Sequence, residues 1–180
     1  MGNSSVLTVA KSSVGMDIQP LSTDEATTIV DLWTALTAGQ REYGAHILGE
    51  ENRTQIRETV LRHAVGDRLL VAREEETDDR GTEGRVTAGN TILGFVMFRI
   101  ETGSFTQDLT RGIIENLYVI PGRRNEGIGS ALLEAAERRL SDDSVDAIAL
   151  EVLAENELAR SFYRRRGYTP HRLELEKSVD

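Results

Sequence analysis

The order of apolar and polar residues along the chain predicts a series of helices and strands. Ile29, Leu32 and Leu36 follow the i, i+3, i+7 spacing of an amphipathic helix, and the pattern breaks at Gly39. Residues 112–120 form the most strand-like run, which a Pro-Gly pair ends. In chain order we predict a strand over 14–19, a helix from 22, a helix over about 52–66, strands over 68–74, 91–101 and 112–120, a helix over 127–140, a strand over 146–152, a helix over 155–166 and a closing strand over 168–177.

This order of elements favours one mixed α/β layer system. Helices and strands do not alternate regularly, so a simple βα repeat is excluded. A length of 180 residues suits one domain. We expect residues 1–14, which are polar and aperiodic, to form a mobile tail before a domain over 15–180. The acidic, glycine-containing stretch 74–90 is expected to be a solvated hairpin loop.

Composition and charge exclude several classes of protein. The chain has 30 acidic and 21 basic residues and a formal charge of −9, which argues against nonspecific binding to nucleic acid or anionic lipid. Cysteine is absent, which excludes disulfides, thiolate metal sites and cysteine nucleophiles. No apolar run approaches the ~20 residues of a membrane span, and the first residues lack a signal-peptide pattern, so we expect a cytoplasmic protein without a membrane partner. The three histidines lack metal-binding spacing and are interpreted as surface residues, and no metal is expected.

The most informative segment covers residues 117–130, where a strand ends, the chain turns and a helix begins with two glycines. Unpaired N–H groups and the helix dipole favour an anion at such a helix start. Gly127 and Gly129 allow close approach to the backbone, and the guanidinium of Arg124 adds a charged fork. The segment therefore predicts a pyrophosphate site; the alternative is a tight strand-to-helix turn without a ligand.

Two motifs specify this hypothesis further. The pattern R-x-x-G-x-G from Arg124, after a strand ending in V-x-P, resembles the acetyl-CoA-binding signature of the GCN5-related N-acetyltransferases (GNAT). About 35 residues later, N-x-x-A-x-x-F-Y-x-x-x-G-Y from Asn156 to Tyr168 resembles the second signature of that family. The motifs stand in the family's order, and the resemblance covers about residues 15–177.

The resemblance implies a fold and a cofactor site. The fold would be an α/β (α+β) GNAT fold with a mixed, mostly antiparallel sheet of six to seven strands, helices on both faces, and a splayed parallel pair over 112–120 and 146–152. The pantetheine arm of acetyl-CoA would pair with backbone groups of Leu117 and Val119, and its pyrophosphate would lie on 124–130. Two residues depart from the commonest pattern: Asn125, which tolerates a left-handed backbone, and Glu126, which we expect to point to solvent. The expected cofactor-binding residues are Leu117, Tyr118, Val119, Arg124, Asn125, Glu126, Gly127, Ile128, Gly129, Ser130 and Asn156.

Two side chains are candidates for proton transfer. Tyr163 matches the tyrosine that protonates the departing CoA thiolate in many members of the family; the alternative is a tyrosine packed in the core. Glu115 shares a face with Leu117 and Val119 by the two-residue period of a strand, and a carboxylate there could take a proton from an incoming ammonium. Burial beside apolar residues would raise its pKa. The alternative is that Glu115 positions the substrate.

The sequence thus predicts an N-acetyltransferase that moves an acetyl group from acetyl-CoA to a primary amine of a small molecule or peptide. Transfer would occur by direct attack in a ternary complex, with acetyl-CoA as co-substrate. The alternative is a non-catalytic acetyl-CoA-binding sensor or regulatory module. The sequence names no particular acceptor, and assembly as a homodimer stays open.

Overall fold

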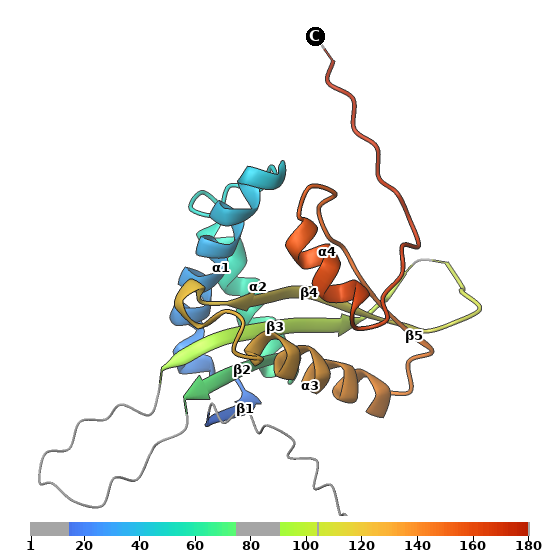
Figure 1. The fold of residues 1–180 in the computed structure, drawn as a ribbon. Helices are drawn as coiled ribbons and strands as arrows, with labels where there is room; N and C mark the ends of the chain where they lie inside the picture. Colours follow the sequence, from blue (N-terminus) through green and yellow to red (C-terminus); the bar gives the residue numbers. More distant parts are fainter. Residues whose placement is uncertain (1–14, 75–90, 104, 180) are drawn as a thin grey trace, which may run out of the picture.

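The computed structural model describes residues 15–74, 91–103 and 105–179, and Figure 1 shows their arrangement. The predicted tail over 1–14 and the predicted loop beyond Glu74 lie outside these residues. Within these described residues, three 3₁₀ turns join the regular elements: η1 (Thr23–Glu25), η2 (Arg41–Tyr43) and η3 (Pro121–Arg123). The regular elements are β1 (Met16–Pro20), α1 (Ala26–Gln40), α2 (Arg53–Val65), β2 (Leu69–Glu74), β3 (Ile92–Ile100), β4 (Arg111–Val119), α3 (Ile128–Asp142), β5 (Ala147–Leu150) and α4 (Glu157–Arg164).

The strands form one sheet in the order β1-β2-β3-β4-β5. Neighbours are antiparallel except for β4 and β5, which are parallel. The predicted mixed and mostly antiparallel sheet is therefore confirmed, with five strands among the described residues in place of six to seven.

The closing strand predicted over 168–177 is the clearest difference. After α4 the chain is irregular and runs away from the sheet (Figure 1). Leu173 and Leu175 have the alternation of a half-buried strand, yet they are 79% and 84% exposed. An alternating pattern specifies a strand only where a neighbouring edge and an apolar surface receive it. Residues 171–177 are all exposed and have neither.

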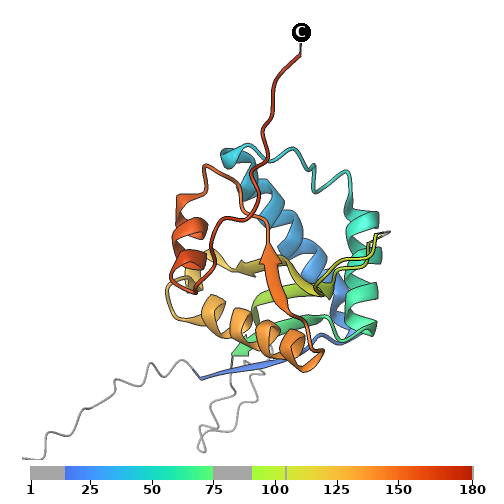
Figure 2. The same ribbon diagram turned by 90° about the vertical axis from the view of Figure 1, so that its right-hand side faces the viewer.

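Helices cover both faces of the sheet. Helices α1 and α2 lie on one face, while α3 covers the other with α4 beside it (Figure 2). Ile29, Val60 and Phe95 are fully buried on the first face, and Phe98 and Leu132 are fully buried on the second. No helix within 15–74, 91–103 or 105–179 combines the length and the apolar character that crossing a membrane requires.

A glycine in β3 sets how closely β3 and β4 approach. A Cβ atom on Gly94 would lie 2.4 Å from the carbonyl oxygen of Tyr118 and 3.2 Å from a methyl carbon of Leu132. Since Gly94 pairs with Val119, any added atom would displace the end of β4 that leads into the glycine-rich turn.

We therefore expect Gly94→Ala to lower the free energy of unfolding by about 1–3 kcal/mol, the usual cost of overpacking. Urea denaturation measures this change. Gly39→Ala is the matched control, because a Cβ at this position of α1 meets nothing within 4 Å. It should leave stability unchanged or raise it by up to ~1 kcal/mol. Equal stabilities of the two variants would contradict the close-approach argument.

Candidate active site

Strand β4 carries a bulge at Glu115, at the point where β4 and β5 separate. On β3, Met97 pairs with Asn116 and Phe98 pairs with Ile114, so Glu115 is the extra residue. The parallel pairing with β5 ends at Ile114. Beyond the bulge, β4 is hydrogen-bonded to β3 on one side, and no strand of the described part of the chain pairs with its other side, which is an open edge.

Backbone groups of Leu117 and Val119 point toward this open edge. The N–H of Ile120 donates to the carbonyl of Leu93 on β3, at 3.0 Å. Because backbone groups in an antiparallel ladder alternate in direction, those of Tyr118 also face β3, while those of Leu117 and Val119 face away. The two residues expected to pair with an added arm are thus in the orientation that such pairing requires. Tyr118, also expected at the cofactor, turns its backbone toward β3.

Arg124 lies at the same edge. Its Nε donates to the carbonyl oxygen of Val119 at 3.2 Å, and its guanidinium carbon lies 5.9 Å from the centre of the Tyr118 ring. The side chain is exposed and its described contacts are with neutral groups. Its positive charge is therefore available to an anion beside α3.

The turn before α3 has the conformation that a helix-start anion site needs. Asn125 and Gly127 have φ values of 67° and 86°, in the left-handed region that asparagine tolerates and glycine favours. The first helical hydrogen bond runs from the N–H of Ala131 to the carbonyl of Gly127, at 3.0 Å. The preceding N–H groups have no acceptor within the helix. They belong to Ile128, Gly129 and Ser130.

The carboxylate of Glu126 differs from its expected orientation. It accepts a hydrogen bond from Nε of Arg123 at 2.8 Å, and Arg123 also bonds to Glu74 of β2 at 2.8 Å. Glu126 is therefore paired rather than directed into solvent. The ion pair reduces the repulsion that an unpaired carboxylate would exert on a phosphate at the start of α3.

The second motif forms α4 and its boundaries. Oδ1 of Asn156 accepts from the N–H of Ala159 at 3.0 Å and caps the helix. Tyr163 is partly buried and packs edge-on against Phe162 and Tyr168, with ring centres 5.2 and 5.8 Å apart. Burial raises the pKa of Tyr163 to about 12. The phenol thus keeps its proton at neutral pH, as a proton donor must.

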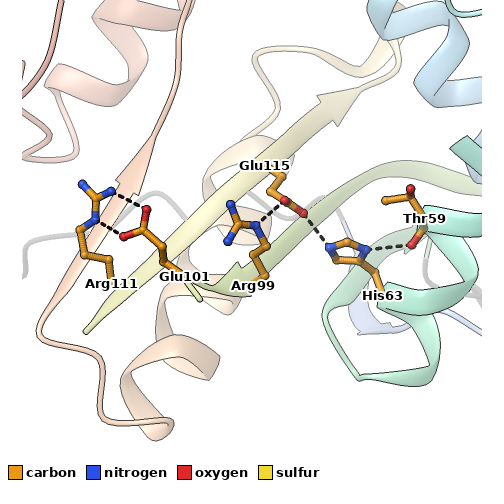
Figure 3. Close-up of polar contacts among 6 residues, drawn as sticks. All are labelled: Thr59, His63, Arg99, Glu101, Arg111 and Glu115. Carbon is orange, nitrogen blue, oxygen red and sulfur yellow. Dashed lines mark hydrogen bonds and ion pairs between the residues drawn. The ribbon is translucent and has the colours of Figure 1, made fainter. Parts of the chain in front are cut away.

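Glu115 is held between two basic side chains (Figure 3). Its Oε2 lies 2.6 Å from Nε2 of His63 on α2, and its Oε1 accepts from Nε of Arg99 on β3 at 2.6 Å. Burial alone would raise the pKa of Glu115, but the hydrogen bonds from His63 and Arg99 outweigh it, and the net pKa is lowered. The expected rise in pKa is therefore wrong, because the sequence did not reveal that His63 and Arg99 bind this carboxylate.

The predicted face of Glu115 is also wrong. Leu117 and Val119 pack into the core under α3, whereas Glu115 contacts His63 on the opposite side of the sheet. The two-residue period would place all three together, but the bulge shifts the period by one residue. Tyr163 packs on the α3 side, so the two candidate proton-transfer residues lie on opposite faces of the sheet.

Sequence reasoning missed His63, which we interpreted as a surface residue. It is only 8% exposed, and its Nδ1 lies 2.8 Å from the carbonyl oxygen of Thr59. A signal was present: His63 follows Ile56 by seven residues and Val60 by three, which places it on the apolar face of the helix.

The mixed sheet, its separating parallel pair and its helices on both faces make up the GNAT fold. The chain belongs to the acetyltransferase (GNAT) family, whose model matches residues 44–168. A GCN5-related N-acetyltransferase from Ralstonia eutropha JMP134 superposes with a TM-score of 0.66 and 23% identity, over 92% of this chain and 99% of that one. The PaiA N-acetyltransferase from Thermoplasma acidophilum, solved in complex with coenzyme A, gives a TM-score of 0.66 and 18% identity, over 89% and 93%.

A curated relative is similar over a shorter region. The uncharacterized protein YxbD of Bacillus subtilis (strain 168) is 30% identical over 96 residues. The match covers 53% of this chain and 55% of YxbD, so this chain aligns with about half the length of that relative.

The contacts of Glu115 make its contribution to stability depend on pH. We expect Glu115→Gln to lower the free energy of unfolding by about 1–3 kcal/mol at pH 7, because Arg99 and His63 lose their carboxylate partner. The folded-state pKa is below the ordinary value of 4.5, so the stabilisation is complete above that pH and is lost as pH falls through the folded-state pKa. Denaturation series at several pH values measure the difference between parent and variant. A difference that stays constant from pH 7 to below 4.5 would contradict this assignment.

Proposed function

We propose that this protein transfers an acetyl group from acetyl-CoA to a primary amine by direct attack in a ternary complex. The observation that carries the proposal is the open edge of β4 directly before the start of α3. This edge offers backbone groups of Leu117 and Val119 to an extended arm. The adjacent helix start offers N–H groups to phosphates. Membership of the acetyltransferase family supports this reading.

Acetyl-CoA would bind with its pyrophosphate on residues 124–130. The N–H groups of Ile128 to Ser130 and the guanidinium of Arg124 supply hydrogen-bond donors and positive charge. The pantetheine arm would lie along the open edge of β4, where it would replace the hydrogen bond from Arg124 to the Val119 carbonyl. A structural neighbour from Thermoplasma acidophilum holds coenzyme A, which supports this class of ligand.

The N–H of Val119 would polarise the thioester carbonyl, as an oxyanion-hole donor does. Glu115 would take the proton of the incoming ammonium, since its 28% exposed side chain lies at the bulge where the edge opens. Tyr163 would protonate the departing thiolate from the other face of the sheet. Much of the rate would come from holding amine and thioester together. Among the described residues, no group of three or more His, Asp or Glu side chains could hold a metal ion, and none of these steps needs one.

The central experiment measures binding and turnover with the same sample. Titration calorimetry with acetyl-CoA tests the site, and a thiol assay for released CoA tests transfer to n-butylamine, spermidine and Nα-acetyl-lysine amide. Binding together with amine-dependent CoA release supports an acetyltransferase. Binding without release from any amine would favour the non-catalytic sensor, and absence of binding would overturn both readings.

The helix-start site is tested by a pair of substitutions at one position. Asp and Asn both tolerate a left-handed backbone like that of Gly127 and differ mainly in charge. We expect Gly127→Asp to weaken acetyl-CoA binding about tenfold or more, because its carboxylate repels the phosphates. Gly127→Asn should weaken binding much less. Calorimetric Kd values of both folded variants provide the comparison, and similar affinities would place the pyrophosphate elsewhere.

The acid role of Tyr163 is tested against its neighbour Tyr168. We expect Tyr163→Phe to lower kcat about 100- to 10,000-fold, less where water substitutes, while the Kd of acetyl-CoA stays near the parent value. Tyr168→Phe loses only the hydrogen bond to Glu137 (2.8 Å) and should cost about 1 kcal/mol of stability without a comparable loss of kcat. Rapid-quench kinetics identify the chemical step. Equal rates of that step in Tyr163→Phe and the parent would leave Tyr163 as a packing residue.

A further inference from the structure

The imidazole of His63 is buried, fixed at both nitrogens and joined to the carboxylate at the open edge. Its side chain is 9% exposed, whereas that of Glu115 is 28% exposed. Nδ1 lies 2.8 Å from the Thr59 carbonyl oxygen within α2, and Nε2 lies 2.6 Å from Oε2 of Glu115 on β4 (Figure 3). Only the carboxylate of this pair is open to an entering molecule.

The partners of the ring define where its protons lie. A backbone carbonyl only accepts hydrogen bonds, so Nδ1 carries a proton in any state that keeps the contact with Thr59. Nε2 faces a carboxylate oxygen, and a contact of 2.6 Å requires one proton between the two atoms. The pair of His63 and Glu115 therefore holds one exchangeable proton, which belongs to the pair as a unit.

We propose that His63 is the final acceptor of the ammonium proton and that Glu115 is the entry through which the proton reaches it. The proposal rests on the proposed function and adds a residue from α2 to it. In the active state the shared proton has left to solvent. The ammonium N–H bond then breaks, its electron pair stays on nitrogen as the nucleophile, and a new N–H bond forms at Nε2 of His63. Glu115 passes the proton and ends as the carboxylate.

The surroundings of Glu115 favour this division of roles. Arg99 on β3 donates to Oε1, and together with His63 it stabilises the ionised carboxylate, which makes Glu115 a poor place to keep a proton. An imidazole releases and takes up its proton near neutral pH. The next charged pair along the strands is Arg111 and Glu101. Arg111 donates two hydrogen bonds of 2.7 Å to the carboxylate of Glu101, so each side chain is occupied by the other (Figure 3). It offers no rival acceptor to the ammonium.

A purely structural role would use the same contacts to tie α2 to β4. His63→Gln separates the two roles, because a glutamine amide can donate to Glu115 but cannot take up a proton. A structural tie predicts that the glutamine variant keeps its activity. A proton acceptor predicts that it does not.

The test measures kcat/KM from pH 6 to 9 with the alkyl amine of highest turnover, whose ammonium stays protonated to about pH 10. The parent should show one limb that rises with pH. His63→Gln should lower kcat about 100-fold and remove that limb, with an unchanged acetyl-CoA Kd. Glu115→Gln should remove the same limb, and the double variant should be no slower than either single variant, because the two residues act as one unit. Glu101→Gln is the matched control and should keep the limb.

The imidazole ¹⁵N spectrum of the parent gives a second measurement that needs no substitution. Nε2 of His63 should lose its proton with a midpoint that matches the kinetic limb. Persistence of both ring protons across the limb, or an unchanged limb in folded His63→Gln, would overturn the relay while acetyl transfer stands. Absence of CoA release from the parent would instead overturn the proposed function, and the relay with it.

Discussion

The bulge at Glu115 is the constraint on which the rest of the site depends. One extra residue in β4, Glu115, shifts the register of β4 against β3. The parallel pairing of β4 with β5 ends at Ile114, the residue before this bulge. The residues of β4 after the bulge pair with β3 alone. The backbone groups of Leu117 and Val119, which face away from β3, are therefore directed to an open edge. The bulge also turns Glu115 toward α2 rather than α3. In a regular ladder Glu115 would share the α3 side with Leu117 and Val119 and could not contact His63.

Charge is distributed around this edge in a way that the net charge of −9 does not suggest. Arg123 is neutralised by Glu126 and Glu74, whereas the described contacts of Arg124 are with a carbonyl and an aromatic ring. The N–H groups at the start of α3 add to the same positive region. An acidic protein can thus present a local site for a polyanion, because a helix terminus and one arginine act over a few ångströms.

The two faces of the sheet divide the proposed chemistry. Glu115 and His63, a residue of α2, lie on the α2 side of the sheet and would remove the proton of the acceptor. Tyr163 packs with Phe162 and Tyr168 on the α3 side and would return a proton to the thiolate. The open edge of β4 lies between them. This separation would keep an imidazole and a phenol from exchanging protons with each other while each meets a different end of the substrates.

The sequence by itself determined the order of helices and strands from β1 to α4 and the turn before α3, because these follow from local apolar periodicity and from glycines at fixed spacing. It also placed Leu117 and Val119 on one side of β4. Tertiary structure decided that residues 168–177 do not form a strand, since an alternating segment becomes a strand only where a sheet edge is available to pair with it. It likewise decided the surroundings of Glu115. The bulge that reverses this side chain, and the pairing with His63 from 52 residues away, arise from contacts between elements, which no local pattern encodes.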